Sequence, residues 1–261
     1  MIRIEQLRCQ REGRTVIDAV SLHVAAGEVV GVLGANGAGK SSLLAAVAGD
    51  LPLNGGTITL AGQPITRLRQ RQLARQRTLL PQTSALEFDL PVPEVVAMGA
   101  YPFDELTAMQ IEQLVSTTLT RADASELATR HYAGLSGGEQ QRVQFARVLL
   151  QTLAACQVNG NAVLLLDEPT GSLDPRHQHG LLASVRALAQ EQGIAVLVVL
   201  HDVNLAARWC DRLLLLKAGR EVAQGAPQAV LQAETLCAVY DMPARVLVDP
   251  DEPGRLLVLF G

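Results

Sequence analysis

One segment of the chain has the spacing of a phosphate-binding loop. Residues 34–41 read GANGAGKS, with Lys40 and Ser41 at the start of an expected helix. Glycines let the backbone curl so that its N–H groups face phosphates, and the helix N-terminus adds partial positive charge. We expect Lys40 to reach the β- and γ-phosphates of a nucleotide and Ser41 to ligate Mg²⁺. A chance glycine-rich turn is disfavoured because an apolar strand precedes the loop. The predicted phosphate contacts are Gly34, Ala35, Asn36, Gly37, Ala38, Gly39, Lys40, Ser41 and Ser42.

Two adjacent carboxylates follow an apolar run later in the chain. Residues 164–169 read LLLDEP. Asp167, at the end of the expected strand, can hold the hydration shell of Mg²⁺, and Glu168 can orient and polarise an attacking water. The alternative is an acidic surface turn. It is disfavoured because a buried strand delivers both acids to the sheet edge that carries the phosphate loop.

Residues 135–142 read LSGGEQQR, which predicts a helix start with an anion site. Ser136 and Glu139 have the S-x-x-E spacing of a capping box, so a purely structural role is one interpretation. The glycines between them leave the first helical N–H groups bare, and such groups bind anions. Both interpretations can hold together.

Two further side chains are weaker candidates. A lone histidine is more often structural, but His201 follows a buried strand that we expect beside the Asp167 strand. There it can hydrogen-bond a γ-phosphate and hold Glu168 and the water in line. Gln82 ends an apolar approach where the core meets a helical segment, and becomes a candidate sensor of the γ-phosphate and of Mg²⁺.

The elements that must position these residues alternate between strands and helices. An apolar run ends at Gly34, and a helix pattern follows that ends near Gly49. From about Pro81 the pattern is helical to about Leu153, and the polar residues 154–161 are predicted to form a surface loop. Alternation thereafter predicts a mostly parallel sheet with an inserted helical subdomain. The other strands are expected at 2–7, 16–24, 57–60, 163–166, 194–200, 213–216 and 221–223, and the other helices at 178–191 and 203–209.

Composition limits the function classes. Of the 261 residues, 48% are hydrophobic and only 3% aromatic, so the core must be aliphatic. A net charge of −4 without a basic run argues against a nucleic-acid binder. The four cysteines form no CxxC pair, which predicts mostly buried, reduced thiols. The N-terminus has no signal-peptide pattern, and no apolar run approaches the roughly 18 residues of a membrane span.

The chain resembles the ATP-binding subunits of ABC transporters over about residues 1–235. The resemblance rests on six features that follow one another in this order: the phosphate loop, Gln82, LSGGEQQR, LLLDEP, SLD (172–174) and His201. The resemblance implies an α/β P-loop NTPase of the ABC ATPase fold. Its RecA-like core would comprise residues 1–83 and 161–235 with an antiparallel β subdomain, the helical subdomain 84–160, and an extension 236–261 that carries no recognised motif.

The resemblance also implies an assembly. Two such chains sandwich two ATP molecules, each between one chain's phosphate loop and Ser136, Gly137 and Gly138 of the other. Asp174 is then a nucleotide contact, although its spacing also fits the N-cap of the next helix. Hydrolysis would move two transmembrane permease subunits, which dock near Gln82, at the cytoplasmic face of a bacterial inner membrane. A periplasmic binding protein would be an indirect partner.

A finer resemblance concerns the cargo. Residues 80–99 are similar to those of subunits that import iron chelates, haem and cobalamin. Residues 152–161, 176–179 and 200–208 are most similar to those of the haem importers. No haem-ligand arrangement is present, so no direct haem contact is expected, and His177 and His179 are interpreted as surface residues. The family usually has an aromatic near position 11, where this chain has Arg11, whose guanidinium plane can also stack on adenine.

Other interpretations stay open. The same machinery could import a ferric siderophore or cobalamin. A soluble ABC ATPase acting on DNA or ribosomes is a different class, and a single short acidic chain fits it poorly.

Overall fold

The computed structural model describes residues 1–82, 89–252 and 254–261. Phe88, which belongs to the stretch similar to the iron-chelate importers, lies outside the described residues, and so does the expected boundary of the helical subdomain at residue 84.

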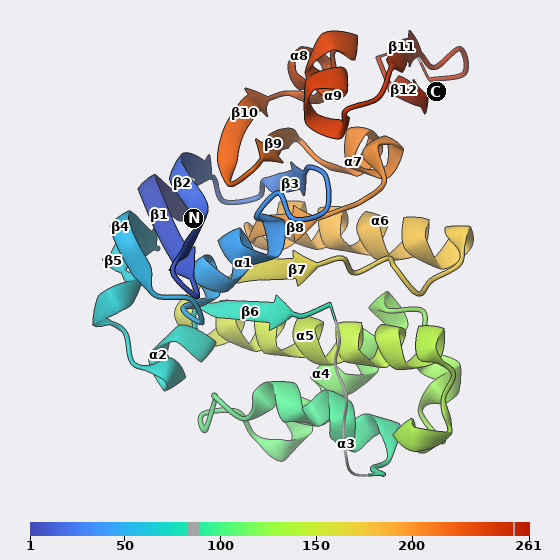
Figure 1. Ribbon diagram of the computed structural model, residues 1–261. Helices are drawn as coiled ribbons and strands as arrows, with labels where there is room; N and C mark the ends of the chain where they lie inside the picture. The colour runs from blue at the N-terminus through green and yellow to red at the C-terminus, as the bar shows by residue number, and fades with distance from the viewer. Residues whose placement is uncertain (83–88, 253) are drawn as a thin grey trace.

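A six-stranded sheet forms the centre of the molecule, in the order β10-β9-β3-β8-β7-β6 (Figure 1). Its pairs are parallel except for β9 with β10, which are antiparallel. The strands are β3 (Val29–Leu33), β6 (Arg77–Leu80), β7 (Val163–Asp167), β8 (Ala195–Val199), β9 (Arg212–Lys217) and β10 (Arg220–Gly225). The central strands are apolar along their whole length because helices or a second sheet cover both faces. The predicted, mostly parallel sheet is therefore confirmed.

A second sheet, entirely antiparallel, has the order β2-β1-β4-β5. Helix α1 (Lys40–Ala48) lies between the two sheets, and its buried residues share one apolar cluster with both of them. Helix α1 ends at Gly49, as the sequence predicted. The strands are β1 (Ile2–Arg11), β2 (Arg14–Val24), β4 (Leu53–Leu60) and β5 (Gln63–Pro64).

The helical region lies on the β6 side of the central sheet, where the long helix α5 (Gly137–Asn159) packs against α3 (Val92–Ala97) and α4 (Ala108–Arg121) (Figure 1). The surface loop predicted at 154–161, within the 152–161 stretch, is wrong. Helix α5 continues through Asn159 and ends at Gly160, which has a left-handed backbone. Ala154 and Ala155 are buried, so one face of this polar stretch packs on the core while the other is hydrated.

The long helix α6 and several shorter helices complete the connections. They are η1 (Ile65–Arg67), α2 (Gln70–Ala74), η2 (Met98–Ala100), η3 (Ser125–Leu127), η4 (Tyr132–Gly134), α6 (Pro175–Gln192), α7 (Val203–Trp209), α8 (Pro227–Val230) and α9 (Ala233–Tyr240). The chain ends in a hairpin of β11 (Ala244–Val248) and β12 (Leu256–Phe260), which lies beside α7 (Figure 1).

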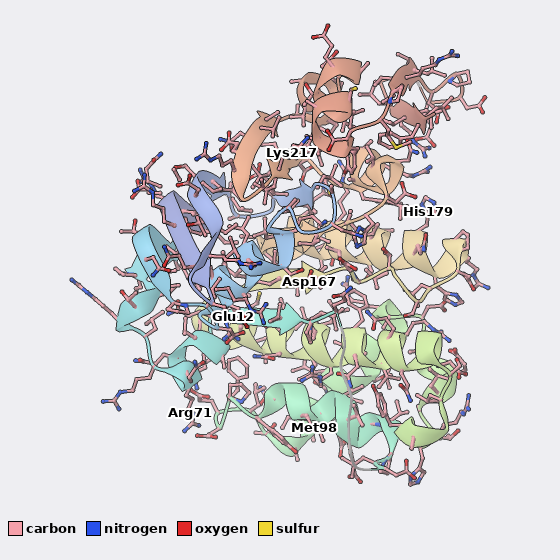
Figure 2. The ribbon with its side chains drawn as sticks, in the orientation of Figure 1. Glu12, Arg71, Met98, Asp167, His179 and Lys217 are labelled. Carbon is pink, nitrogen blue, oxygen red and sulfur yellow. The ribbon has the colours of Figure 1, made fainter. Side chains whose placement is uncertain are left out.

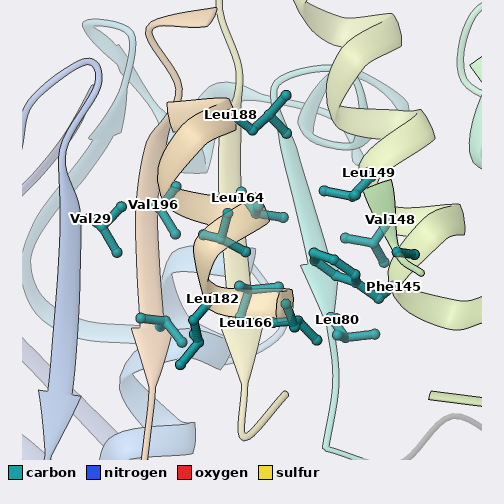
Figure 3. Close-up of a cluster of buried hydrophobic side chains, with 14 of the residues drawn as sticks. Val29, Leu80, Phe145, Val148, Leu149, Leu164, Leu166, Leu182, Leu188 and Val196 are labelled. Atoms are coloured by element: carbon teal, nitrogen blue, oxygen red, sulfur yellow. The ribbon is translucent and has the colours of Figure 1, made fainter. Parts of the chain in front are cut away.

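The main core is aliphatic, as the composition predicted. Phe145 of α5 is fully buried and lies near Leu80 on the sheet, while Leu164, Leu166 and Leu182 fill the neighbouring space (Figure 3). Burying one such side chain contributes about 1.5–3 kcal/mol. This packing fixes β7 and β8, and hence the residues that follow their carboxyl ends.

Candidate active site

The phosphate loop connects β3 to α1, and its shape requires glycine. Gly34 and Gly39 have φ angles of 152° and 102°. A Cβ at Gly34 would lie 2.3 Å from the Leu216 carbonyl oxygen, and one at Gly39 would lie 2.6 Å from the Val16 carbonyl oxygen. Because both obstacles are backbone atoms, a side chain at either position would displace a strand. The sequence signal for this loop therefore has a direct steric basis.

Lys40 is held within this loop. Its side chain is buried, and Nζ donates hydrogen bonds to the carbonyl oxygens of Gly34 (2.8 Å) and Ala35 (3.1 Å). Burial lowers the pKa of Lys40, while the negative charges of Glu168 and Asp167 oppose that effect. The ammonium group is thus a compact positive charge at the mouth of the loop, suited to a phosphate.

Ser41 and Asp167 bring two oxygen ligands together at the start of α1. Ser41 Oγ donates a hydrogen bond of 3.2 Å to Asp167 Oδ1, at the carboxyl end of β7 (Figure 2). Burial raises the pKa of Asp167, and the hydrogen bond from Ser41 partly offsets this shift. Hard oxygen atoms are the ligands Mg²⁺ prefers, and it typically takes one or two from protein and the rest from phosphates and water. This donor pair fits Mg²⁺.

Glu168 is held from both sides. Gln82 Nε2 donates to Glu168 Oε2 at 2.7 Å, and His201 Nε2 lies 2.5 Å from Oε1. The Glu168 side chain is 14% exposed, whereas that of His201 is 50% exposed. The Glu168 backbone donates to the Val199 carbonyl oxygen at 3.2 Å, which anchors it to β8. The Glu168 carboxylate is therefore fixed in position, and the His201 ring beside it is accessible to a ligand in the cavity.

All of these side chains except Asp167 line one open cavity of ≈ 580 Å³. This volume lies within the usual range for small-molecule sites. Most predicted nucleotide contacts are brought together there. Val16 also lines the cavity, and no pattern in the sequence pointed to it. The lining residues are Arg11, Val16, Asn36, Gly37, Ala38, Gly39, Lys40, Ser41, Ser42, Gln82, Glu168 and His201.

The LSGGEQQR segment, residues 135–142, does not line that cavity. Ser136 caps α5: its Oγ accepts from the Glu139 amide at 3.4 Å, and its own amide donates to Glu139 Oε2 at 2.7 Å. The capping interpretation is confirmed. Ser136 and Gly137 are exposed and do not line the cavity, so this chain alone does not bring the two predicted phosphate sites together. Gly138 packs near the Ser172 carbonyl, to which an added Cβ would come within 3.2 Å.

Asp174 also lies outside the cavity and acts as a cap. Its Oδ1 accepts from the His177 amide at 3.0 Å, and its Oδ2 lies 2.9 Å from His177 Nδ1. The N-cap interpretation of Asp174 is therefore confirmed. His177 and His179, interpreted from the sequence as surface residues, are half-buried on α6, and His179 Nδ1 accepts from Trp209 Nε1 at 3.2 Å. Only the D-P-x-H spacing from Asp174 to His177 signals part of this arrangement.

Comparison with known proteins decides the family. The ABC transporter family model matches residues 17–171. The chain belongs to this family. The hemin import ATP-binding protein HmuV of Bordetella parapertussis is 52% identical over 258 residues, which cover 99% of this chain and 98% of that protein. A protein of the same name from Pseudomonas fluorescens is 46% identical, with 99% of each chain covered.

Solved structures agree with the fold. A metal-chelate type ABC transporter in an inward-facing conformation superimposes with a TM-score of 0.78 at 24% identity, covering 100% of this chain and 96% of that chain. The family therefore accounts for the predicted fold, a P-loop NTPase of the ABC ATPase type. No helix in the described part of the chain is long and apolar enough to cross a bilayer.

Proposed function

We propose that this chain is the ATP-hydrolysing subunit of a bacterial haem importer. The observation that carries hydrolysis is the Glu168 carboxylate, fixed between Gln82 and His201 in the cavity that also contains Lys40. The observation that supports haem as cargo is the 52% identity, across 99% of this chain, with a protein named for hemin import.

The geometry supports a mechanism based on positioning and charge. ATP would place its phosphates over the loop, where backbone N–H groups and Lys40 balance their negative charge. Glu168 would accept a hydrogen bond from a water in line with the γ-phosphate, and orient it for attack. His201 and Gln82 would exchange part of their contact with Glu168 for contact with the γ-phosphate. After hydrolysis, the loss of the γ-phosphate would break these contacts of His201 and Gln82.

Mg²⁺ would be held by Ser41 and Asp167, with Gln82 reaching it as well. When bound, Mg²⁺ neutralises charge on the β- and γ-phosphates. Arg11 lines the same cavity, so its guanidinium plane can stack on adenine in place of the usual aromatic ring.

The second half of the site would come from another copy of the chain. Ser136, Gly137 and Gly138 lie at an exposed helix N-terminus, and Asp174 lies at another. A head-to-tail dimer would place them against the γ-phosphate held by the partner, which gives the bare N–H groups of α5 an anion.

The remaining partners follow from the importer assignment. Two transmembrane permease subunits would dock near Gln82, placing the chain at the cytoplasmic face of the inner membrane, with a periplasmic binding protein as an indirect partner. No nucleic acid is expected as a partner, and no direct contact with haem.

The decisive experiment is transport into vesicles that contain this chain, its permease and its binding protein. We expect ATP-dependent uptake of haem and little uptake of a ferric siderophore or cobalamin. Preference for one of the latter would replace the cargo and keep the ATPase. Absence of membrane association when the permease is co-expressed would contradict the importer itself and favour the soluble class.

A further inference from the structure

The C-terminal extension, residues 236–261, lies close to the hydrolysis site although it carries no nucleotide motif. It contains the last turns of α9 and both strands of the terminal hairpin. Leu236, Val239 and Val258 are buried in the same apolar cluster as Leu200 and Val203, which flank His201. The extension is thus continuous with the core at the segment that carries a catalytic candidate.

One side chain joins the hairpin to α7. Asn204 Oδ1 accepts from the Val258 amide at 2.7 Å, and Asn204 Nδ2 donates to the Val258 carbonyl at 3.1 Å. On its other edge, Val258 is paired with Val246 of β11. The Asn204 amide therefore takes the place of a neighbouring strand and satisfies both backbone groups of Val258.

Helix α7 is in turn closely tied to His201. The Asp202 carboxylate caps the helix. It accepts hydrogen bonds from the backbone N–H of Asn204 at 2.7 Å and from the backbone N–H of Leu205 at 3.0 Å. Strand β8 ends at Val199, and the Leu200 amide donates to the Val32 carbonyl at 3.2 Å. His201 is therefore held in a short connection between β8 and the start of α7, and a shift of α7 would move its ring relative to Glu168.

The extension also reaches the phosphate loop. Lys217 Nζ donates to the Ala238 carbonyl at 2.6 Å and to Asp241 Oδ1 at 2.7 Å, which holds α9 against β9 (Figure 2). Burial raises the pKa of Tyr240 to about 12, and the Gly34 backbone lies close enough to oppose that rise. The Tyr240 hydroxyl is buried and makes no hydrogen bond of normal geometry. The extension thus lies behind the cavity in two places: Tyr240 is close to the phosphate loop, and Val258 is joined to α7, which follows His201.

We propose that Asn204 is a positioning residue for His201, and that the extension acts through it to keep the imidazole against Glu168. This inference rests on the proposed role of His201 in hydrolysis. Asn204 does not line the cavity, so it acts by fixing the start of α7 and does not touch the nucleotide.

The test uses the full-length chain and steady-state ATP hydrolysis. Asn204→Leu keeps the branching of the side chain at Cγ and removes both hydrogen bonds to Val258. We expect kcat to fall about tenfold, because small displacements of a positioned group are costly, while KM and ATP affinity stay within about twofold. Asn204→Asp keeps the acceptor and loses the donor, so its kcat is expected to be intermediate. It also carries the test if the leucine variant does not fold.

A double-mutant cycle separates positioning from general stability. In a His201→Ala background, Asn204→Leu is expected to lower kcat further by less than about twofold, because the group it positions is gone. The matched control is Gln232→Leu, which removes an amide-to-carbonyl hydrogen bond from Gln232 to Gln228, on the adjoining connection between α8 and α9. It is expected to leave kcat unchanged.

Two results would overturn the proposal alone: wild-type kcat in both Asn204 variants, or effects of Asn204→Leu and His201→Ala that multiply. Wild-type kcat in His201→Ala would instead remove His201 from the reaction, and the proposal with it. The two failures are therefore distinguishable.

Discussion

The phosphate-loop cavity and the N-terminus of α5 are both candidate phosphate sites, but they differ in completeness. In the cavity, Lys40, Ser41, Glu168 and their partners already contact one another within a single chain. At Ser136, the capping box is complete, but Ser136 and Gly137 are exposed and lie outside the cavity. We therefore expect the first site to bind a nucleotide alone and the second site to need a ligand that another molecule presents.

The comparison is tested most strongly at Glu168. Glu168→Gln keeps the shape of the side chain and removes the carboxylate that orients water. We expect kcat to fall about 10³-fold, within the range for loss of a general base, while ATP binding is retained. Single-turnover hydrolysis and nucleotide binding measure the two effects separately. The variant is also expected to accumulate as a nucleotide-bound dimer in size-exclusion chromatography, and rapid turnover would remove Glu168 from the role of base.

The second test addresses the exposed N-terminus of α5. Ser136→Arg should leave ATP binding to the isolated chain unchanged, because Ser136 does not line the cavity. Hydrolysis should fall about 10²-fold, since the donors for the partner's γ-phosphate are blocked.

The matched control for Ser136→Arg is Thr107→Arg. Thr107 caps α4 through the same kind of capping box, with Gln110 as its partner, and it does not line the cavity. We expect Thr107→Arg to remove the cap of α4 and to leave ATP hydrolysis unchanged. Equal loss of activity in both variants would show that helix capping, and not a composite site, explains Ser136.

The smallest expected effect concerns pH and the capping box. Hydrogen bonds from the Ser136 backbone and side chain, with help from Arg130, lower the pKa of Glu139 below its ordinary value of 4.5. A lowered pKa means that the folded chain favours the carboxylate. Its contribution to stability is therefore complete above pH 4.5 and is lost as pH falls through the lowered pKa.

Thermal unfolding at several pH values measures this contribution. Glu139→Gln retains a capping-box acceptor without a titrating charge, so the gap in melting temperature between wild type and variant should narrow in acid. A gap that does not change with pH would show that the carboxylate charge has no part in the cap. The effect of this substitution on binding at the phosphate loop should be negligible.

The sequence was sufficient where one residue type has a fixed spacing and a fixed steric reason. Gly34 and Gly39, the strand ending in Asp167, and the capping box at Ser136 were all predicted from such patterns. The stretch 154–161 was misinterpreted because its polar residues conceal Ala154 and Ala155, which are buried only when α5 packs on the core. The Asn204 contact could not be predicted, since it joins residues 54 positions apart through a backbone group that any residue supplies.

The backbone of Glu168 is strained. Its φ of +51° is in the left-handed region, which costs a non-glycine residue about 1 kcal/mol or more. A glycine there would relax the backbone and leave the chain without the carboxylate proposed to act in hydrolysis. Directed evolution for heat resistance alone would therefore tend to replace the residue proposed to orient the attacking water, and any such campaign on this protein needs a screen for activity at every round.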